Sequence, residues 1–320
     1  MKKALALIVS LILLISCAAA GTGLAEEKEL RIVTTIFPIY DWTREIICSD
    51  ATHVKLTLLL DNGVDLHSYQ PTAQDILTIS TADLFIYVGG ESDAWVKEVL
   101  ASAMNPDLKA VSLVEAMGDA IRMEETVEGM EEEHGDEEEE EEEADEHVWL
   151  SLRNAQRLTA AIADALAEID PDHAAHYQEN AAAYFGKLAD LDARYTEVVD
   201  SARVKTFLFG DRFPFRYLAD DYGLAYYAAF SGCSAESEAS FQTIVFLAQK
   251  VDELGLPAVL TLENPRMKIA ETVVQNTAEK DQKILALDSI QGTTAADIQN
   301  GITYLSIMEA NLEVLKEALN

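Results

Sequence analysis

Short apolar segments rich in β-branched and aromatic residues alternate with segments of helical periodicity along most of the chain. The short segments predict strands at residues 30–35, 54–60, 83–88, 205–210, 226–230, 257–262 and 283–287. Between the second and third of them, Thr72-Ala73-Gln74-Asp75 follows Pro71 and has the pattern of a capping box, which predicts a helix start. Strands separated by helices are typical of βαβ units, so the pattern predicts an α/β fold with mostly parallel sheets.

The segment from Asp172 to Ser201 contains no proline and has apolar residues at near-helical spacing over about eight turns. It predicts one long helix between two α/β lobes. We therefore expect an N-terminal lobe at 29–171, a connecting helix at 172–203 and a C-terminal lobe at 204–320. Because open α/β sheets bind ligands at the carboxyl ends of their strands, the site is expected in the cleft where the two lobes face each other.

The first residues have the pattern of a signal peptide, with two lysines, an apolar run at 4–15 and then Ser16-Cys17-Ala18. Leu14-Ile15-Ser16-Cys17 resembles a lipobox, which predicts cleavage of a 1–17 signal peptide and lipidation of Cys17. The alternative is an ordinary secretory signal cut after Ala20 or Ala25. Residues 18–28 would form a tether, and the protein would be a membrane-anchored lipoprotein outside the cytoplasm, at a cell surface or in a periplasm.

The composition is strongly acidic, with 57 Asp and Glu against 23 Lys and Arg and a formal net charge of −34. This balance argues against nucleic acid as a partner, because phosphates attract Lys and Arg. Sixteen of the acidic residues lie between Glu124 and Glu146, where there is no Lys, no Arg and no apolar periodicity. The stretch at 124–146 is expected to be a mobile, solvated loop that buries no core and concentrates cations near a binding cleft.

Two histidines and one aspartate occupy positions suited to a divalent metal ion. His67 follows the predicted strand 54–60, His147 lies where the acidic stretch meets apolar sequence, and Asp288 follows the predicted strand 283–287. Imidazole nitrogen and carboxylate oxygen are ligands for hard to borderline divalent ions. From spacing alone, the simpler interpretation that each histidine caps a turn or is exposed is favoured.

The other histidines receive simpler interpretations. His173 and His176 follow Asp170-Pro171 three residues apart, which favours an exposed pair over a second metal site. His53, just before a predicted strand, is expected to be exposed. Trp42 and Trp149 are expected in the core, and Cys48 and Cys233 could pair in an oxidising exterior, although sequence separation does not decide this.

Several motifs in chain order resemble those of the metal-binding receptors of bacterial ABC transporters, the zinc and manganese uptake lipoproteins. Residues 63–72 fit the pattern G-x-[DE]-x-H-x-[YF]-[EQ]-P of that family. The remaining similarities are at residues 32–40, 83–87, 147–150 with Asn154-Ala155, 216–219 with 222–224, and 285–288. Together they cover essentially the whole predicted mature chain.

The resemblance implies two α/β lobes joined by one long helix, with the metal held in the cleft by His67, His147 and Asp288. It implies a monomeric receptor, not an enzyme, that captures Zn²⁺ and delivers it to a membrane permease for import. Mn²⁺ or Fe²⁺ is the less favoured cargo. Zinc-uptake members often carry an acidic loop with a histidine before the second His motif, and His134 occupies that place here.

The chain departs from the family pattern at the third ligand, which falls on Arg212. A guanidinium has no lone pair to offer a metal, so Arg212 cannot coordinate and would instead contact a ligand from the second sphere or admit an anion. Either water completes the site or a neighbouring side chain does. The candidates are Asp211, Cys233, Glu236, Glu238 and Glu263. Of these, a Cys233 thiolate would favour zinc over manganese.

Two functions of other classes remain open at this point. Two histidines, an aspartate and a water also form the site of zinc hydrolases, but the chain has no His-Glu-x-x-His motif and no evident general base beside a ligand. A surface adhesin would be compatible with a lipid anchor and an acidic loop.

Overall fold

The computed structural model of the chain describes residues 29–48, 51–130, 143–234, 238–263 and 267–320. The predicted signal peptide with Cys17, His134 of the acidic stretch, and the ligand candidate Glu236 lie outside these residues. No described helix combines the length and the apolar character that crossing a membrane requires.

The N-terminal part of the chain forms a sheet of four parallel strands in the order β2-β1-β3-β4. The strands are β1 (Leu30–Thr34), β2 (Val54–Leu58), β3 (Leu84–Tyr87) and β4 (Lys109–Ser112). The first three were predicted within two residues at each end. Strand β4 was missed because it is short, begins with a lysine and has only one buried residue, Ser112, so it carries no apolar signal.

The second half repeats this arrangement in a sheet of four parallel strands in the order β6-β5-β7-β8. They are β5 (Thr206–Arg212), β6 (Ala225–Phe230), β7 (Ala258–Thr261) and β8 (Lys283–Ala286). All four were predicted, although β5 continues two residues beyond the expected end and finishes at Arg212. The α/β class with parallel sheets is therefore confirmed.

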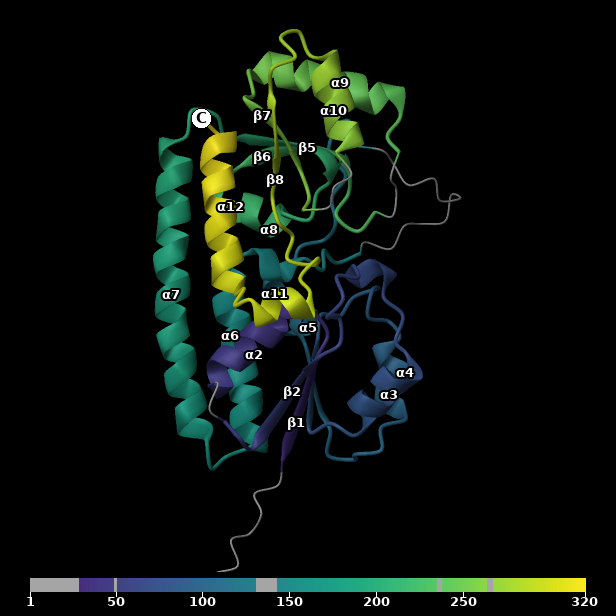
Figure 1. Cartoon of the computed structure of the whole chain (residues 1–320), viewed down its shortest axis with the longest axis vertical. Coiled ribbons are helices and arrows are strands. Elements are labelled where there is room, and N and C mark those ends of the chain that lie inside the picture. The colour runs from purple at the N-terminus through teal and green to yellow at the C-terminus, as the bar shows by residue number, and fades with distance from the viewer. Residues whose placement is uncertain (1–28, 49–50, 131–142, 235–237, 264–266) are drawn as a thin grey trace, which may run out of the picture.

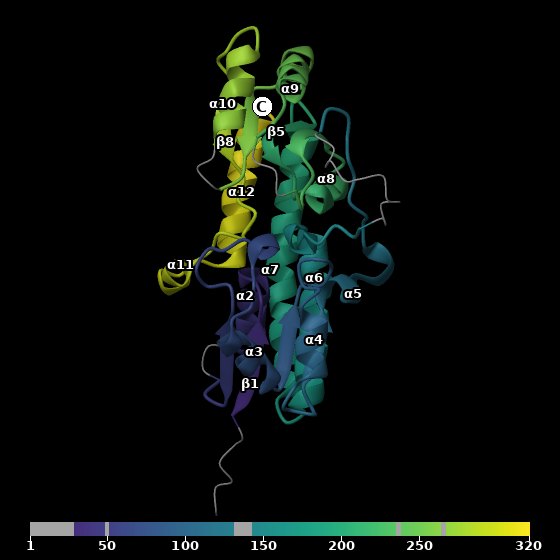
Figure 2. The same cartoon turned by 90° about the vertical axis from the view of Figure 1, so that its right-hand side faces the viewer.

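A long helix, α7 (Ala174–Ser201), runs beside both sheets along most of the molecule (Figures 1 and 2). It lies antiparallel to α6 (Leu152–Ile169) and packs against α2 (Phe37–Ile47) and α12 (Tyr304–Ala318). The predicted connecting helix thus exists within two residues of its expected start and end. The remaining α-helices among the described residues are α3 (Ala73–Ser80), α4 (Val96–Ala101), α5 (Leu113–Met117), α8 (Arg216–Tyr222), α9 (Phe241–Leu254), α10 (Lys268–Asn276) and α11 (Ala295–Gln299). Division of the chain into lobes at the ends of α7 stays a prediction.

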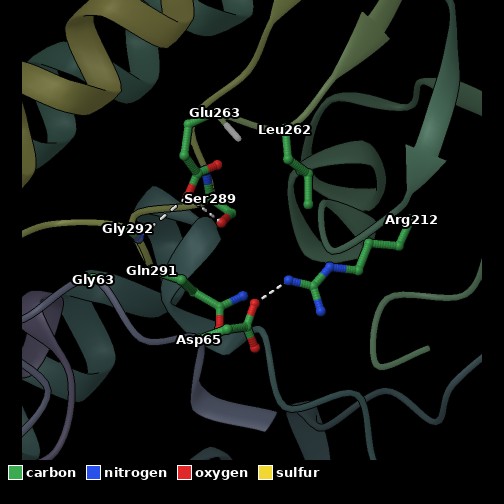
Figure 3. Close-up of a pocket in the computed structure, with 8 residues that line it drawn as sticks. All are labelled: Gly63, Asp65, Arg212, Leu262, Glu263, Ser289, Gln291 and Gly292. Atoms are coloured by element: carbon green, nitrogen blue, oxygen red, sulfur yellow. Dashed lines mark hydrogen bonds and ion pairs between the residues drawn. The ribbon is translucent and has the colours of Figure 1, made fainter. Parts of the chain in front are cut away.

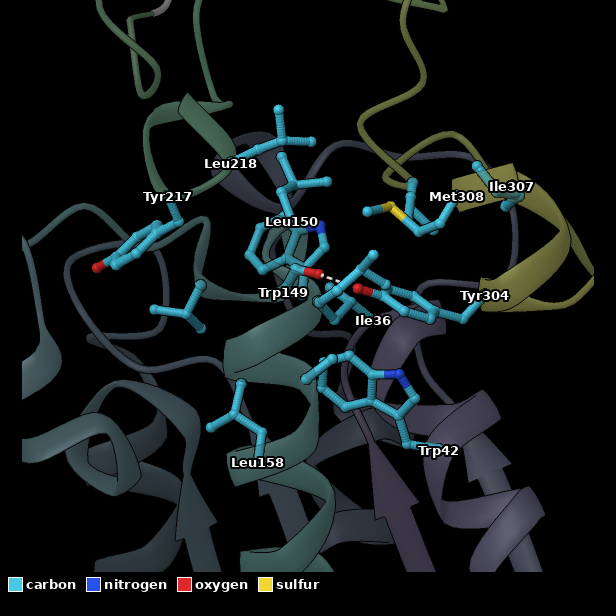
Figure 4. Packing of buried hydrophobic residues seen from close by; sticks show 14 of the residues in the cluster. Ile36, Trp42, Trp149, Leu150, Leu158, Tyr217, Leu218, Tyr304, Ile307 and Met308 are labelled. Atoms are coloured by element: carbon cyan, nitrogen blue, oxygen red, sulfur yellow. Dashed lines mark hydrogen bonds between the residues drawn. The ribbon is translucent and has the colours of Figure 1, made fainter. Parts of the chain in front are cut away.

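A cluster of buried aromatic residues connects the two halves of the chain (Figure 4). The indole of Trp149 donates to the carbonyl of Ser289 at 2.9 Å, and the hydroxyl of Tyr304 donates to the carbonyl of Trp149 at 2.7 Å. Tyr304 also meets Trp42 edge to face, with ring centroids 5.1 Å apart. The two tryptophans are fully buried, as predicted. Because Trp149 lies two residues after His147, this cluster fixes the backbone that carries the histidine.

One close approach between a strand and a helix predicts a stability effect. A methyl group on buried Gly210 of β5 would lie 2.5 Å from Cα of Ala270 in α10, so Gly210→Ala is expected to destabilise the protein by about 1–3 kcal/mol. The matched control is Gly186→Ala in α7, where the position is exposed and the added methyl meets no other atom. That change is expected to stabilise by about 0.5–1 kcal/mol. Urea unfolding followed by circular dichroism measures both, and equal effects of the two substitutions would contradict the steric argument.

Candidate metal centre

His67 lies in a single 3₁₀ turn, η1 (Leu66–Ser68), in the loop between β2 and α3. The Asp65 carboxylate caps this turn by accepting from the backbone N–H of His67 at 3.0 Å. The N–H of Leu66 donates to the side chain of Gln291 from the second half of the chain at 3.2 Å. The turn is therefore fixed from within and from the opposite half of the molecule.

His147 is fully buried and immediately precedes a second 3₁₀ turn, η3 (Val148–Leu150). One oxygen of Asp145 lies 2.9 Å from both the backbone N and the ring Nδ1 of His147. The hydroxyl of Tyr217 in turn donates to the carbonyl of Asp145 at 2.9 Å. Because an ionised carboxylate only accepts hydrogen bonds, Nδ1 of His147 carries the proton and Nε2 presents a lone pair. This carboxylate–imidazole arrangement is the one that orients metal-binding histidines.

The two imidazoles meet through their Nε2 atoms, which are 3.2 Å apart. Nδ1 of His67 is engaged by the hydroxyl of Ser92 at 2.7 Å, and Glu146 lies on the same side with a carboxylate oxygen 3.8 Å from that nitrogen. Two nitrogens bound to one tetrahedral zinc ion at about 2.05 Å would be about 3.3 Å apart. The pair thus has the spacing of two ligands of a single ion.

Cys233 supplies a third ligand atom at the same point. Its sulfur and the ligand nitrogens of His67 and His147 all lie within 4.8 Å of one another. Cys233 belongs to the loop after β6, and its backbone N–H donates to Glu124 at 3.0 Å. A Cβ on the preceding Gly232 would lie 3.1 Å from Cε1 of His147, so glycine allows this loop to approach the imidazole closely. Cys233 is a free thiol, as is Cys48, so the two do not pair.

The surroundings shift the pKa values of His67 and Cys233 in opposite directions. Burial, followed by the charge of His147, lowers the pKa of His67 to about 3, so this ring is neutral and ready to bind at neutral pH. Burial and then the charge of Glu124 raise the pKa of the Cys233 thiol well above its usual range. A metal ion that binds here must therefore displace the thiol proton.

Arg212 binds a carboxylate instead of a metal. Its guanidinium at the end of β5 forms an ion pair with Asp65, the residue that caps the turn of His67 (Figure 3). The pair spans a small pocket between the two halves of the chain. The pocket is lined by Gly63, Asp65, Arg212, Leu262, Glu263, Ser289, Gln291 and Gly292. Arg212 thus holds Asp65 in place, and Asp65 in turn caps the turn that carries the candidate ligand His67.

The predicted acidic ligands are held by backbone groups nearby. Asp288 accepts from the N–H of Ile290 at 2.7 Å, and its carboxylate is not among the described side chains that group with the two imidazoles. Burial and the charge of Glu263 raise the pKa of Asp288 to about 7. Glu263 itself accepts from the N–H and the hydroxyl of Ser289, and Asp211 accepts from the N–H of Leu262. Of the candidate replacements for the third ligand that the structure describes, only Cys233 joins the two histidines.

The acidic stretch is more ordered at its ends than the sequence predicted. Met123 and Ala144 form an antiparallel bridge that closes its base, and Met130 is buried. Glu124 contacts Cys233, and Asp145 and Glu146 are almost completely buried beside the histidines. The prediction of a solvated loop over all of 124–146 was therefore wrong at both ends, because acidic side chains there contact the candidate ligands. The roles of Asp145, Glu146 and Ser92 were missed, and the adjacency Asp145-Glu146-His147 was the one signal for them.

Comparison with known proteins agrees with this geometry. Residues 32–318 match the ZnuA family, described as the periplasmic component A of the zinc-uptake complex. The zinc-binding lipoprotein AdcA of Streptococcus pneumoniae R6 is 35% identical over 321 positions, covering 99% of this chain and 61% of the relative. The high-affinity zinc uptake system protein ZnuA of Bacillus subtilis is 30% identical over 315 positions, covering 96% of this chain and 94% of the relative.

The crystal structure of the Zn(II)-bound ZnuA-like domain of S. pneumoniae AdcA superimposes with a TM-score of 0.70 at 32% identity, over 91% of this chain and 99% of the domain. This chain spans about three fifths of the length of the AdcA relatives, whereas it spans nearly all of the B. subtilis protein. The family match over residues 32–318, together with the structural match to the zinc-bound domain, shows that the chain belongs to the ZnuA family of periplasmic zinc-uptake components.

Proposed function

We propose that this protein is an extracytoplasmic receptor that captures Zn²⁺ and delivers it to the permease of an ABC importer. The observation that carries the proposal is the meeting of two Nε2 atoms at 3.2 Å with a cysteine sulfur beside them. The printed names of the relatives, which bind or take up zinc, support the same cargo. Members of the family are solute-binding receptors rather than enzymes and work with ABC permeases.

The proposed ligands are His67, His147 and Cys233, with Asp288 or water in the fourth position. Because the Asp288 carboxylate is not grouped with these three ligand atoms, its coordination would involve a rearrangement of the loop after β8. A thiolate in the set favours zinc over manganese, which prefers oxygen ligands. Lipidation at Cys17, accessory capture by His134 and a monomeric state remain part of this proposal. A hydrolase or an adhesin is not favoured.

Metal titration of the purified protein tests the proposal. Calorimetry with Zn²⁺, Mn²⁺ and Fe²⁺ is expected to give the highest affinity for Zn²⁺, and His67→Ala is expected to abolish that high-affinity equivalent. Cells that lack the protein are expected to grow poorly when zinc is scarce, and the wild-type chain should restore growth. Restoration of growth by the His67→Ala/His147→Ala double variant would refute the receptor function. A higher affinity for Mn²⁺ than for Zn²⁺ would refute zinc as the cargo.

A further inference from the structure

A second group of metal-ligating side chains lies at the turn between α6 and α7. Its members are His53, from the segment before β2, Asp170 at the end of α6, and His173 at the start of α7. One ligand atom from each lies within 4.8 Å of the other two. The expectation that His53 is exposed was wrong, because its contact with Asp170, 117 positions away, buries most of its side chain, whereas His173 stays partly exposed. His176, by contrast, is exposed as expected.

The three side chains converge on one carboxylate. Nε2 of His53 lies 3.2 Å and Nδ1 of His173 lies 2.9 Å from the same oxygen of Asp170. The two imidazole rings stack nearly parallel with centroids 4.1 Å apart, so both present a nitrogen edge toward that oxygen. Two imidazole nitrogens and a carboxylate oxygen are a donor set that suits Zn²⁺ and other borderline divalent ions.

The surroundings hold this arrangement in place. The hydroxyl of Tyr177 donates to Asp170 at 2.5 Å, and the carbonyl of His53 accepts from the N–H of Leu30 in β1 at 2.8 Å. Although burial opposes it, hydrogen bonds from Tyr177 and His173 keep the pKa of Asp170 below its usual value, so the carboxylate is ionised at neutral pH. The side chains of His53 and Asp170 are each 15% exposed and that of His173 is 34% exposed, which leaves room for an ion to approach.

This group is separate from the candidate metal centre. His147 lies five residues before the start of α6, ahead of the turn η3, whereas Asp170 caps the other end of α6. Because α6 has 18 residues, its ends are about 27 Å apart, and the α6–α7 turn lies at the far end of the molecule from the facing edges of the sheets (Figure 1). A single ion cannot be shared between the two groups.

We propose that His53, Asp170 and His173 form a second binding site for a divalent transition-metal ion, with Zn²⁺ as its best-suited occupant. The bound ion would join the segment before β2 to the α6–α7 turn. The site lies outside the transport cleft, so the proposal does not depend on the ligands of the cargo site.

The test uses the full chain with the cleft disabled by His67→Ala/His147→Ala. Equilibrium dialysis against Zn²⁺ followed by metal analysis is expected to retain one zinc equivalent. Adding His173→Gln, which keeps a hydrogen-bond donor but removes the imidazole, is expected to weaken that binding by about tenfold or more. Adding His176→Ala, the matched control on the same helix, is expected to leave it unchanged. If the variants with added His173→Gln and with added His176→Ala bound the same amount of zinc, the proposal would be overturned.

A spectroscopic measurement covers the case in which a variant folds poorly. Four histidines remain in the double variant, His53, His134, His173 and His176. Titration with Zn²⁺ followed by NMR of the imidazole resonances is expected to shift those of His53 and His173 together. Shifts confined to His134, or no shift at all, would mean that the group is a hydrogen-bonded network only.

Discussion

Replacing His147 with alanine is expected to lower the affinity for Zn²⁺ by about 100-fold or more. Removal of a partner that only orients a metal-binding histidine typically costs about 10–100-fold, and loss of the ligand itself should cost more. His147 is fully buried, and its ring contacts Asp145 on one side and lies close to Gly232 on another. Competition with a zinc-binding dye measures the change in the dissociation constant.

Asp145→Asn separates the orienting role from coordination. An amide oxygen still accepts from Nδ1–H of His147 but carries no charge, so we expect a smaller loss of about 10–100-fold. His176→Ala, an exposed histidine on α7, is the control and should leave cleft affinity unchanged. If His147→Ala bound zinc as tightly as that control, the two-imidazole centre would be refuted.

Much of the fold could be predicted because the central strands of both sheets are buried on both faces and therefore form continuous apolar runs. The strand Leu84–Tyr87 and the strand Ala258–Thr261 are of this kind, and both were predicted. Strand Lys109–Ser112 lies at the edge of its sheet, has a single buried residue and gave no such run. The long helix was predictable because one apolar stripe continues over its whole length.

The site was predictable only in part, because ligand sets depend on contacts between distant segments. His67 and His147 follow from motifs that resemble a known family, and Cys233 was one of several open candidates. These three residues come together because the two halves of the chain, each with its own sheet, pack face to face. No local sequence pattern predicts that packing. The same holds for the ion pair of Arg212 with Asp65, where the residue that breaks the family pattern contacts a carboxylate 147 positions away.

Replacing Cys233 with serine is expected to remove most of the pH dependence of zinc binding. The raised pKa of the thiol means that it is protonated in the metal-free protein between pH 6 and 8, so coordination releases one proton. The thiol should then make the affinity rise by about tenfold for each unit of increasing pH, and coordination by Asp288, whose pKa is about 7, would add to this slope only in the lower part of the range. His67, with a pKa of about 3, is already deprotonated across this range and adds no slope. A serine hydroxyl keeps its proton, so the variant should bind more weakly and with a flatter profile.

Competition titrations at pH 6, 7 and 8, together with calorimetry in buffers of different ionisation enthalpy, give the slope and the number of protons released. Cys48→Ser is the matched control, since Cys48 is a free thiol that is not part of either ligand group among the described residues. It should keep the wild-type slope. Equal slopes in Cys233→Ser and the wild type would show that the sulfur stays protonated and does not bind the metal. Because a thiolate favours Zn²⁺ over Mn²⁺, Cys233→Ser should also prefer Zn²⁺ less strongly than the wild type does. If the sulfur does not bind the metal, the two proteins should show the same preference.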